Sequence, residues 1–344
     1  MFTPQFGSRK ASPEYLLLID RANLNDEQAR FGEEVSQRLE AGGVFVDRYY
    51  FQNDPRTCRL REPHSPMLTL HELAARHPEH QLLIFSDGAG FINPITGEPE
   101  HWLTLLGHWP RRVLLTPELA TLDDYRELAL AENDFFILPA TADGLVALTE
   151  ALGGGGAPKP SSNGHARPFP RLILERPKRW LERNEPRPTV ASELCDQLKQ
   201  YLGDDGWQWL AACAVYPTLS WEVTLYVGYK LFGKTEDFEQ RLLSLVRLPW
   251  FRYGTMPDWL RLRLIESFTP EQEIAVRRAL EDLLLSALDH PREGVELEFA
   301  APAPAEKSVG WRQRLQALKA KLADWRRRRR LGDLLKNEPP ESPL

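Results

Sequence analysis

The sequence predicts an α/β domain with a doubly wound, mostly parallel sheet, followed by a mainly helical domain. Short continuous apolar runs, as in Tyr15–Ile19 and Leu82–Phe85, are typical of parallel strands that are buried on both faces. Helical segments separate these runs, and this alternation is that of consecutive βαβ units. After residue 188 the apolar residues change to helical spacing, which indicates a second domain of a different class.

Residues 10–152 are expected to form the α/β domain. Asn25 and Asp26 are suited to cap its first helix, which should end at the glycines that follow Ala41. Asp143 is expected to cap its last helix. The expected strands are 15–19, 44–51, 82–85, 113–115 and 135–138, and the expected helices are 26–41, 68–76 and 144–152.

The Gly- and Pro-rich residues 153–188 predict a linker, and residues 189–299 predict the helical domain. Leu248–Trp259 has the length of a β-hairpin wing or an ordered loop. Thr269 and Pro270 mark the start of the last helix. A bundle of this kind with one hairpin-sized insertion is winged-helix-like. Its expected helices are 189–201, 206–215, 221–231, 237–245, 259–267 and 270–288.

Composition indicates a two-domain protein of the cytoplasm. The chain has 344 residues, too many for one core, and 42% of them are hydrophobic. The sequence has no apolar run of membrane-spanning length, and its N-terminus does not resemble a signal peptide. Cys58, Cys195 and Cys213 are odd in number and widely spaced, which suits a reducing compartment and gives no metal-binding pattern.

Charge is concentrated at the C-terminal end. The chain carries a net charge of −6, yet residues 307–336 hold eleven basic and two acidic residues. Residues 306–336 therefore predict a basic amphipathic helix that needs a surface to pack against. That surface is the acidic body of the same chain, a partner protein, anionic lipid or nucleic acid. The expected contact residues are Trp311, Leu315, Leu318, Leu322, Trp325, Arg326, Arg327, Arg328, Arg329 and Arg330.

Two aspartates lie where apolar strands end. Asp20 follows the first strand, and Ser86 and Asp87 follow the strand 82–85. Ligands of open α/β sheets bind at the carboxyl ends of the strands, and two carboxylates there suit Mg²⁺ or Mn²⁺. Asp20, Ser86 and Asp87 are therefore the candidate metal ligands. The sequence contains no phosphate-binding glycine loop of the usual patterns, so no nucleotide cofactor is expected.

This arrangement resembles an integrin-type von Willebrand factor A (vWA) domain. Asp20 stands where that family begins its Asp-x-Ser-x-Ser motif, and Ser86-Asp87-Gly88 is similar to its later Thr-Asp-Gly. The positions of the two serines are Ala22 and Leu24, so two hydroxyl ligands are missing. The resemblance thus implies a degenerate vWA-like, Rossmannoid domain, and on this interpretation no cofactor is expected.

The same residues resemble PIN-like nucleases of the NYN type. Ile19-Asp20-Arg-Ala-Asn23 matches the end of that family's first strand, and Ser86-Asp87-Gly-Ala-Gly-Phe91 is similar to its Ser-Gly-Asp-x-Asp-Phe. This resemblance implies a Mg²⁺- or Mn²⁺-dependent nuclease that uses Asp20, Asn23 and Asp87. The motif's second aspartate is absent here, at Ala89 or Gly90. Asp54, Glu72 and Asp123 are other acidic residues of this domain.

A wider resemblance covers residues 10–290. Trp207–Gly228 and Leu245–Arg261 look like a winged-helix region of bacterial multidomain proteins, many of which carry a formylglycine-generating-enzyme-like domain. The segments around Asp20, Cys58 and Ser86 are also similar to the first domain of these proteins. The resemblance implies a module of bacterial signalling or conflict systems.

Together these features favour a non-enzymatic adaptor or regulatory subunit. It would bind protein partners, encoded nearby, through the helical domain and the tail. The nuclease is the first alternative. A DNA-binding regulator is the second, although helix 270–288 has only Arg277 and Arg278 as cations among several acidic residues.

Overall fold

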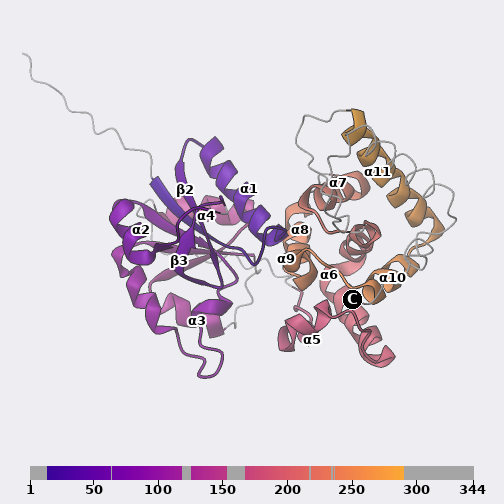
Figure 1. Cartoon of the computed structure of the whole chain (residues 1–344), viewed down its shortest axis with the longest axis horizontal. Coiled ribbons are helices and arrows are strands. Elements are labelled where there is room, and N and C mark those ends of the chain that lie inside the picture. The colour runs from indigo at the N-terminus through magenta and orange to yellow at the C-terminus, as the bar shows by residue number, and fades with distance from the viewer. Residues whose placement is uncertain are drawn as a thin grey trace, which may run out of the picture. The chain divides into compact units, whose positions relative to one another are not determined.

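The structure is a computed structural model that describes residues 14–62, 64–117, 125–152, 167–216, 218–233, 235 and 237–289. The chain divides into two compact units at residues 166 and 167. The first contains a sheet covered by helices, and the second is helical, as Figure 1 shows. The predicted fold class is confirmed for both. The tail, residues 306–336, lies outside the described residues.

The sheet of the first unit has seven strands in the order β4-β3-β2-β1-β5-β6-β7. Five neighbouring strands, β2-β1-β5-β6-β7, are parallel. At one edge β3 pairs antiparallel with β2, and β4 pairs antiparallel with β3. The strands are β1 (Glu14–Asp20), β2 (Phe45–Gln52), β3 (Asp54–Arg59), β4 (Leu68–Thr69), β5 (Gln81–Phe85), β6 (Arg112–Thr116) and β7 (Phe135–Pro139).

The topology explains why β1 is the most apolar strand. It pairs with β2 on one side and with β5 on the other, so all its residues after Glu14 are buried. The chain first winds from β1 to β2 and then crosses back to β5. The strand order therefore reverses between β1 and β5, and this is the switch point at which doubly wound sheets bind ligands.

The sequence did not predict β3 and β4. Only Pro55 and Cys58 of β3 are buried, so the strand lacks an apolar pattern. It forms because Asn53, with φ 61°, turns the chain back along β2. Residues 68–76 were expected to be one helix, but Leu68–Thr69 is β4 and the helix begins at Leu70.

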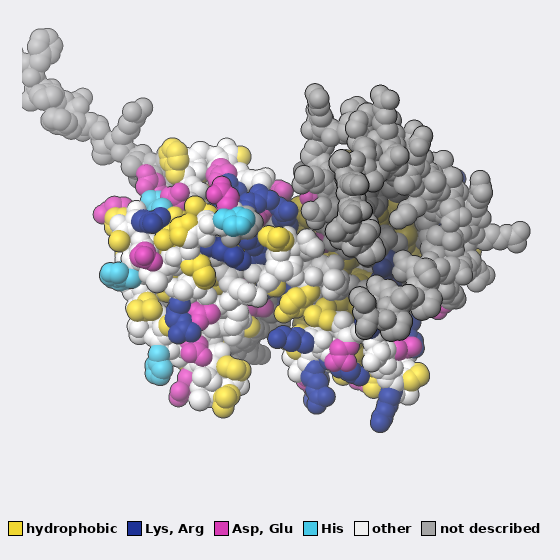
Figure 2. All heavy atoms as spheres, viewed as in Figure 1, with side chains coloured by type: hydrophobic (Ala, Val, Ile, Leu, Met, Phe, Trp, Pro, Cys, Tyr) yellow, Lys and Arg dark blue, Asp and Glu magenta, His cyan; other side chains and the backbone are white. Residues whose placement is uncertain are grey.

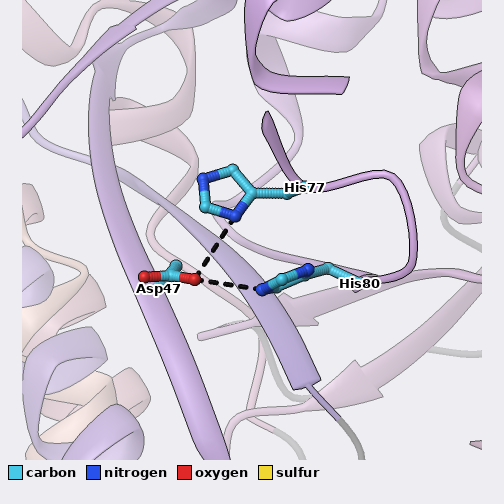
Figure 3. A group of neighbouring side chains, drawn as sticks. All are labelled: Asp47, His77 and His80. Carbon is cyan, nitrogen blue, oxygen red and sulfur yellow. Dashed lines mark hydrogen bonds and ion pairs between the residues drawn. The ribbon is translucent and has the colours of Figure 1, made fainter. Parts of the chain in front are cut away.

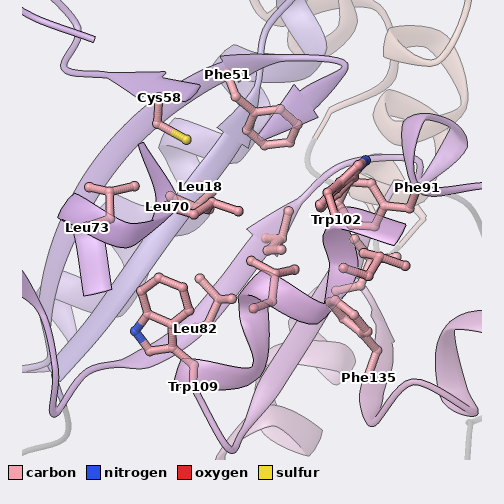
Figure 4. Packing of buried hydrophobic residues seen from close by; sticks show 14 of the residues in the cluster. Leu18, Phe51, Cys58, Leu70, Leu73, Leu82, Phe91, Trp102, Trp109 and Phe135 are labelled. Atoms are coloured by element: carbon pink, nitrogen blue, oxygen red, sulfur yellow. The ribbon is translucent and has the colours of Figure 1, made fainter. Parts of the chain in front are cut away.

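Helices cover both faces of the sheet. One face packs against α2 (Leu70–Arg76), α3 (Tyr125–Ala131) and the 3-10 helix η2 (His101–His108), with the apolar side chains of Figure 4 between them. The other face receives α1 (Glu27–Ala41), where a Cβ on Gly32 would lie 2.6 Å from the Phe85 ring. The short η1 (Ala89–Phe91) follows β5, and α4 (Ala142–Leu152) follows β7.

The caps of these helices were only partly predicted. Asp26 caps α1 as expected, since its Oδ1 accepts a hydrogen bond from the Ala29 amide at 3.1 Å. The last helix of this unit, α4, begins at Ala142, so the predicted cap Asp143 lies inside its first turn. The amide of Gly144 donates to Thr141 Oγ1, 3.3 Å away, so the hydroxyl of Thr141 satisfies an amide of its first turn.

The helices predicted for the second unit occur within one residue of their expected outer ends, whereas three short helices at residues 171–175, 177–181 and 249–253 were not predicted. The two helices expected within residues 189–215 form one element, which is kinked at Gly203, where φ is 69°. Thr269 and Gln272 exchange side-chain and backbone hydrogen bonds at the start of the last helix. The helices are α5 (Arg171–Glu175), the 3-10 helix η3 (Pro177–Leu181), α6 (Pro188–Val215), α7 (Trp221–Phe232), α8 (Phe238–Val246), α9 (Pro249–Tyr253), α10 (Asp258–Glu266) and α11 (Pro270–Asp289).

Two expectations for this unit need correction. Leu248–Trp259 was expected to be a hairpin wing or a loop, but it contains α9 and the start of α10. No strand occurs among the described residues from 167 to 289. Residues up to 188 were expected to be linker, yet from Phe169 on they pack on the helices: Trp250 Nε1 donates to Trp180 O at 2.8 Å, and Trp259 Nε1 to Glu182 O at 3.2 Å.

None of the described helices combines the length and the apolar character that crossing a bilayer requires.

Candidate functional site

Asp20 lies at the switch point, where the sequence placed the candidate site. Its side chain ends β1 and is only 3% exposed. Oδ1 accepts a hydrogen bond from the Asn53 amide at 3.0 Å, and Oδ2 accepts one from Ser86 Oγ at 3.4 Å. Both carboxylate oxygens thus already have protein donors, which is how a buried charge is stabilised without a cation.

Ser86 belongs to the same network, whereas Asp87 makes a separate contact. The Ser86 hydroxyl also accepts a hydrogen bond from the Gly88 amide at 3.1 Å. Asp87 is half-buried, and its Oδ1 accepts from the Ala89 amide at 3.0 Å, so its carboxylate stabilises the turn after β5. The structure therefore brings Asp20 and Ser86 into contact as expected, while the turn of residues 87–89 engages Asp87.

Gly90 explains why the second aspartate of the nuclease motif is absent. A Cβ at this position would lie 2.0 Å from the carbonyl oxygen of Asn53. The loop after β5 therefore passes directly against the β2–β3 turn, and no side chain fits between them. Asp20, Asn53, Ser86 and Gly90 together form what we call the Asp20 cluster. It joins three loops at the carboxyl edge of the sheet.

Three further candidate residues, Asn23, Asp54 and Glu72, make hydrogen bonds with residues close to them in the sequence. Asn23 Oδ1 accepts from the Asn25 amide at 2.7 Å, in the loop that leads to α1. Asp54 Oδ2 accepts from Arg56 Nε at 2.7 Å, and Glu72 Oε2 accepts from the Thr69 amide at 2.7 Å. Asp123 lies outside the described residues.

Positive charge gathers beside the Asp20 cluster. Arg21 stacks on the Tyr50 ring at 4.1 Å. Burial lowers the pKa of its guanidinium; Tyr50 and Glu33 oppose this change, while the nearby Arg59 and Arg61 add to it. We call these three arginines the arginine patch. Lys and Arg side chains gather on the visible face of the first unit in Figure 2. The patch suits an anionic group on a partner.

Beneath the patch, Tyr50 Oη donates to the buried Glu33 at 2.7 Å. Burial and this carboxylate raise the pKa of Tyr50 to about 12. Arg61 also lies 3.7 Å from Glu33, so one buried acid anchors part of the patch.

Sequence reasoning missed a different group of residues, at the amino edge of the sheet. Asp47 of β2 lies between His77 and His80, which flank the short connection from α2 to β5. Burial lowers the pKa of His77. The His-x-x-His spacing of residues 77–80 was the available signal. Its carboxylate partner comes from a strand thirty residues earlier and is evident only once β2 and β5 flank β1.

The tail residues from Trp311 to Arg330 lie outside the described residues, so their contacts stay predictions. No protein-family model, no curated protein and no solved structure matches this chain.

Proposed function

We propose that this protein is a non-enzymatic adaptor or regulatory subunit that acts in the cytoplasm by binding other proteins. One observation carries the proposal: the Asp20 carboxylate is buried and accepts hydrogen bonds from Asn53 and Ser86. A metal-dependent hydrolase needs open ligand positions on its cation, and these oxygens are committed to the fold. The resemblance to bacterial signalling and conflict proteins suggests the kind of assembly.

The loops at the carboxyl edge support a protein partner. Ile95 is 92% exposed, and hydrogen bonds constrain the backbone of its loop: Asn93 Oδ1 accepts from the amides of Ile95 at 2.9 Å and Thr96 at 3.2 Å. Leu24, in the loop after β1, is 66% exposed. An ordered loop that holds an aliphatic side chain in water provides an anchor for a partner at little entropic cost.

The helical unit and the basic tail are the other expected contact surfaces. The tail stripe from Trp311 to Trp325 would bury five large side chains, each contributing about 1.5–3 kcal/mol when fully desolvated. Its arginines favour a partner with an acidic surface, as the arginine patch does.

The test is capture from native cells with the tagged full chain, followed by measurement of the affinity for the purified partner. Leu318 and Leu322, both replaced by Asp, should weaken binding at least tenfold, because each loses its apolar contact. Ala317 and Ala320, both replaced by Asp, are the control, since they change charge equally outside the stripe. Ile95→Asp is compared in the same way with Leu128→Asp, which alters an exposed leucine on α3.

The proposal fails if the wild-type chain captures no stoichiometric protein. It also fails if the stripe variant and its control bind the partner equally and Ile95→Asp has no effect.

The nuclease remains a second candidate because the arginine patch lies beside Asp20 and could hold phosphates. Its test is cleavage of labelled RNA and DNA in Mg²⁺ or Mn²⁺ by the wild type, Asp20→Asn and Asp87→Asn. The adaptor proposal predicts no metal-dependent cleavage by any of them. If the wild type cleaves nucleic acid and both variants have lost this activity, the protein is a nuclease and the adaptor proposal is wrong.

The DNA-binding alternative has less support. Arg277 of α11, one of its two expected phosphate contacts, lies 3.3 Å from the Glu273 carboxylate and is largely buried. A gel-shift titration with duplex DNA at increasing salt would reveal such binding by its salt dependence.

A further inference from the structure

Asp47, His77 and His80 place three potential metal ligands together at the amino edge of the sheet. Asp47 is the third residue of β2, His77 follows the last residue of α2, and His80 precedes the first residue of β5. Figure 3 shows the Asp47 carboxylate facing both imidazole rings. Because the parallel strands run in one direction, this group lies at the opposite edge from the Asp20 cluster.

The distances are close to those of a tetrahedral site. Asp47 Oδ2 lies 3.3 Å from His77 Nδ1 and 3.0 Å from His80 Nε2, and all three ligand atoms are within 4.8 Å of one another. Zinc bonds of about 2.0–2.1 Å to nitrogen and oxygen place neighbouring ligand atoms about 3.3–3.5 Å apart. Small movements of the side chains would therefore admit an ion among them.

The surrounding residues hold the imidazoles in place. The side chains of His77 and His80 are 11% and 13% exposed, whereas that of Asp47 is 54% exposed, so the group opens to solvent on the carboxylate side. Tyr49 Oη lies 3.0 Å from His77 Nε2, and Trp109 Nε1 donates to His77 O at 3.2 Å. The two rings pack edge to face at 4.6 Å.

A cation could occupy the space beside Asp47 that two imidazole N–H protons would otherwise take, because each proton can move to the other nitrogen of its ring. Without an ion, a proton on His77 Nδ1 and one on His80 Nε2 would let both rings donate to Asp47 Oδ2, at 3.3 and 3.0 Å. With an ion bound, each neutral ring would carry its proton on the other nitrogen, and His77 Nε2–H would donate to Tyr49 Oη, 3.0 Å away. Such an outer partner is the usual companion of a histidine ligand. His80 Nδ1 is buried and has no hydrogen-bond partner in the described part of the chain. No hydrogen bond at this atom therefore determines which ring nitrogen of His80 carries the proton.

A second carboxylate, outside the group of three, lies close enough to His80 to become the fourth ligand if its side chain moves. Glu14, the first residue of β1, lies with Oε2 3.8 Å from His80 Nε2. Two imidazoles with carboxylate oxygens suit Zn²⁺ and related transition metals, while Mg²⁺ and Ca²⁺ prefer oxygen ligands alone.

We propose that Asp47, His77 and His80, with Glu14, form a structural site for a divalent transition metal of the zinc class. The ion joins the amino ends of β2, β1 and β5, the three strands whose carboxyl ends meet at the Asp20 cluster. This inference is independent of the proposed adaptor function.

The test uses the full chain, without a histidine tag and stripped of metal by a chelator. Co²⁺ is the probe, because its visible absorption bands report nitrogen and oxygen ligands, and competition with Zn²⁺ gives the zinc affinity. We expect one tight ion per chain. His77→Asn and His80→Asn should remove the bands, and His71→Asn, a control at an exposed histidine outside the group, should keep them.

Two further variants guard against misfolding. Asp47→Asn replaces a half-exposed side chain by one of the same shape and should also abolish the bands. Tyr49→Phe removes the outer hydrogen bond to His77, together with the one between Tyr49 and Arg76, and should weaken affinity by about 10–100-fold. Zn²⁺ should raise the thermal unfolding midpoint of the wild type but not of Asp47→Asn. The proposal is overturned if the wild type binds no Co²⁺, or if folded Asp47→Asn keeps both the bands and the thermal shift.

Discussion

Single side chains show how the switch point is closed. The Asn53 amide and the Ser86 hydroxyl both donate to Asp20, whose carboxylate is buried. Removing the carboxylate leaves these buried donors unpaired, so Asp20→Ala should lower the free energy of unfolding by about 3 kcal/mol. Urea denaturation followed by circular dichroism measures this loss. Asp87→Ala removes an acceptor on an outer turn and should cost about 1 kcal/mol. Equal losses would contradict the assigned roles.

Gly90 offers a second test of the same closure. A Cβ there would lie 2.0 Å from Asn53 O, so Gly90→Ala must displace one of the two loops. We expect a loss of about 1–3 kcal/mol. Gly107→Ala is the control, because a Cβ at Gly107 meets no atom within 4 Å. A Gly90→Ala variant as stable as Gly107→Ala in thermal denaturation would show that the loops do not meet in this way.

The sequence predicted part of this cluster. Asp20 and Ser86 follow apolar strands, and their meeting at one edge follows from parallel pairing alone. The contributions of Asn53 and Gly90 depend on the left-handed turn before β3 and on its contact with a loop far along the chain. No local pattern reports such a contact. The Asp47–His77–His80 group was missed for the same reason.

At the level of helices and strands, α2 begins with a capping box. Thr69 and Glu72 exchange hydrogen bonds, and the bonds from the Thr69 amide and hydroxyl lower the pKa of Glu72. A carboxylate with a lowered pKa stabilises the fold above its unfolded pKa of about 4.5, and this contribution is lost as pH falls through the folded value.

Glu72→Gln should therefore destabilise the protein at pH 7, and the difference from the wild type should shrink below pH 4. Thermal unfolding across this pH range measures it. Glu132→Gln removes the same charge from an exposed position outside the box. If both variants follow one pH profile, the capping box does not stabilise α2 as described.

Elements with a strong local pattern were predicted well. Runs rich in apolar and aromatic residues identified the five parallel strands, helical spacing identified α7 and α10, and predicted caps marked the starts of α1 and α11. The missed elements owe their structure to distant partners. Residues 169–182 read as linker because of their prolines, yet Trp180 packs into the helical unit and accepts a hydrogen bond from Trp250. The expected wing was replaced by α9, which Pro249 begins and the left-handed Gly254 ends.

For the chain as a whole, the two units have separate cores. Each is compact, with the division between residues 166 and 167. Fragments of residues 14–152 and 167–289 should each fold alone. Residues 153–166 are rich in Gly, Ser and Pro, so limited digestion with a protease of broad specificity, such as proteinase K, is expected to separate the two units within this segment. Isolated fragments that lose their circular dichroism spectra would show that each unit needs the other.

The closed switch point is the central feature of the account, and the Mg²⁺ dependence of stability tests it most directly. Calorimetric unfolding of the full chain is measured with and without Mg²⁺ at constant ionic strength, for the wild type and Asp20→Asn. A cation bound to the folded state at about 100 times its Kd would add about 2.7 kcal/mol. We predict no Mg²⁺-dependent stabilisation of either protein. Stabilisation of the wild type that Asp20→Asn abolishes would show that Asp20 is a metal ligand and would contradict the account.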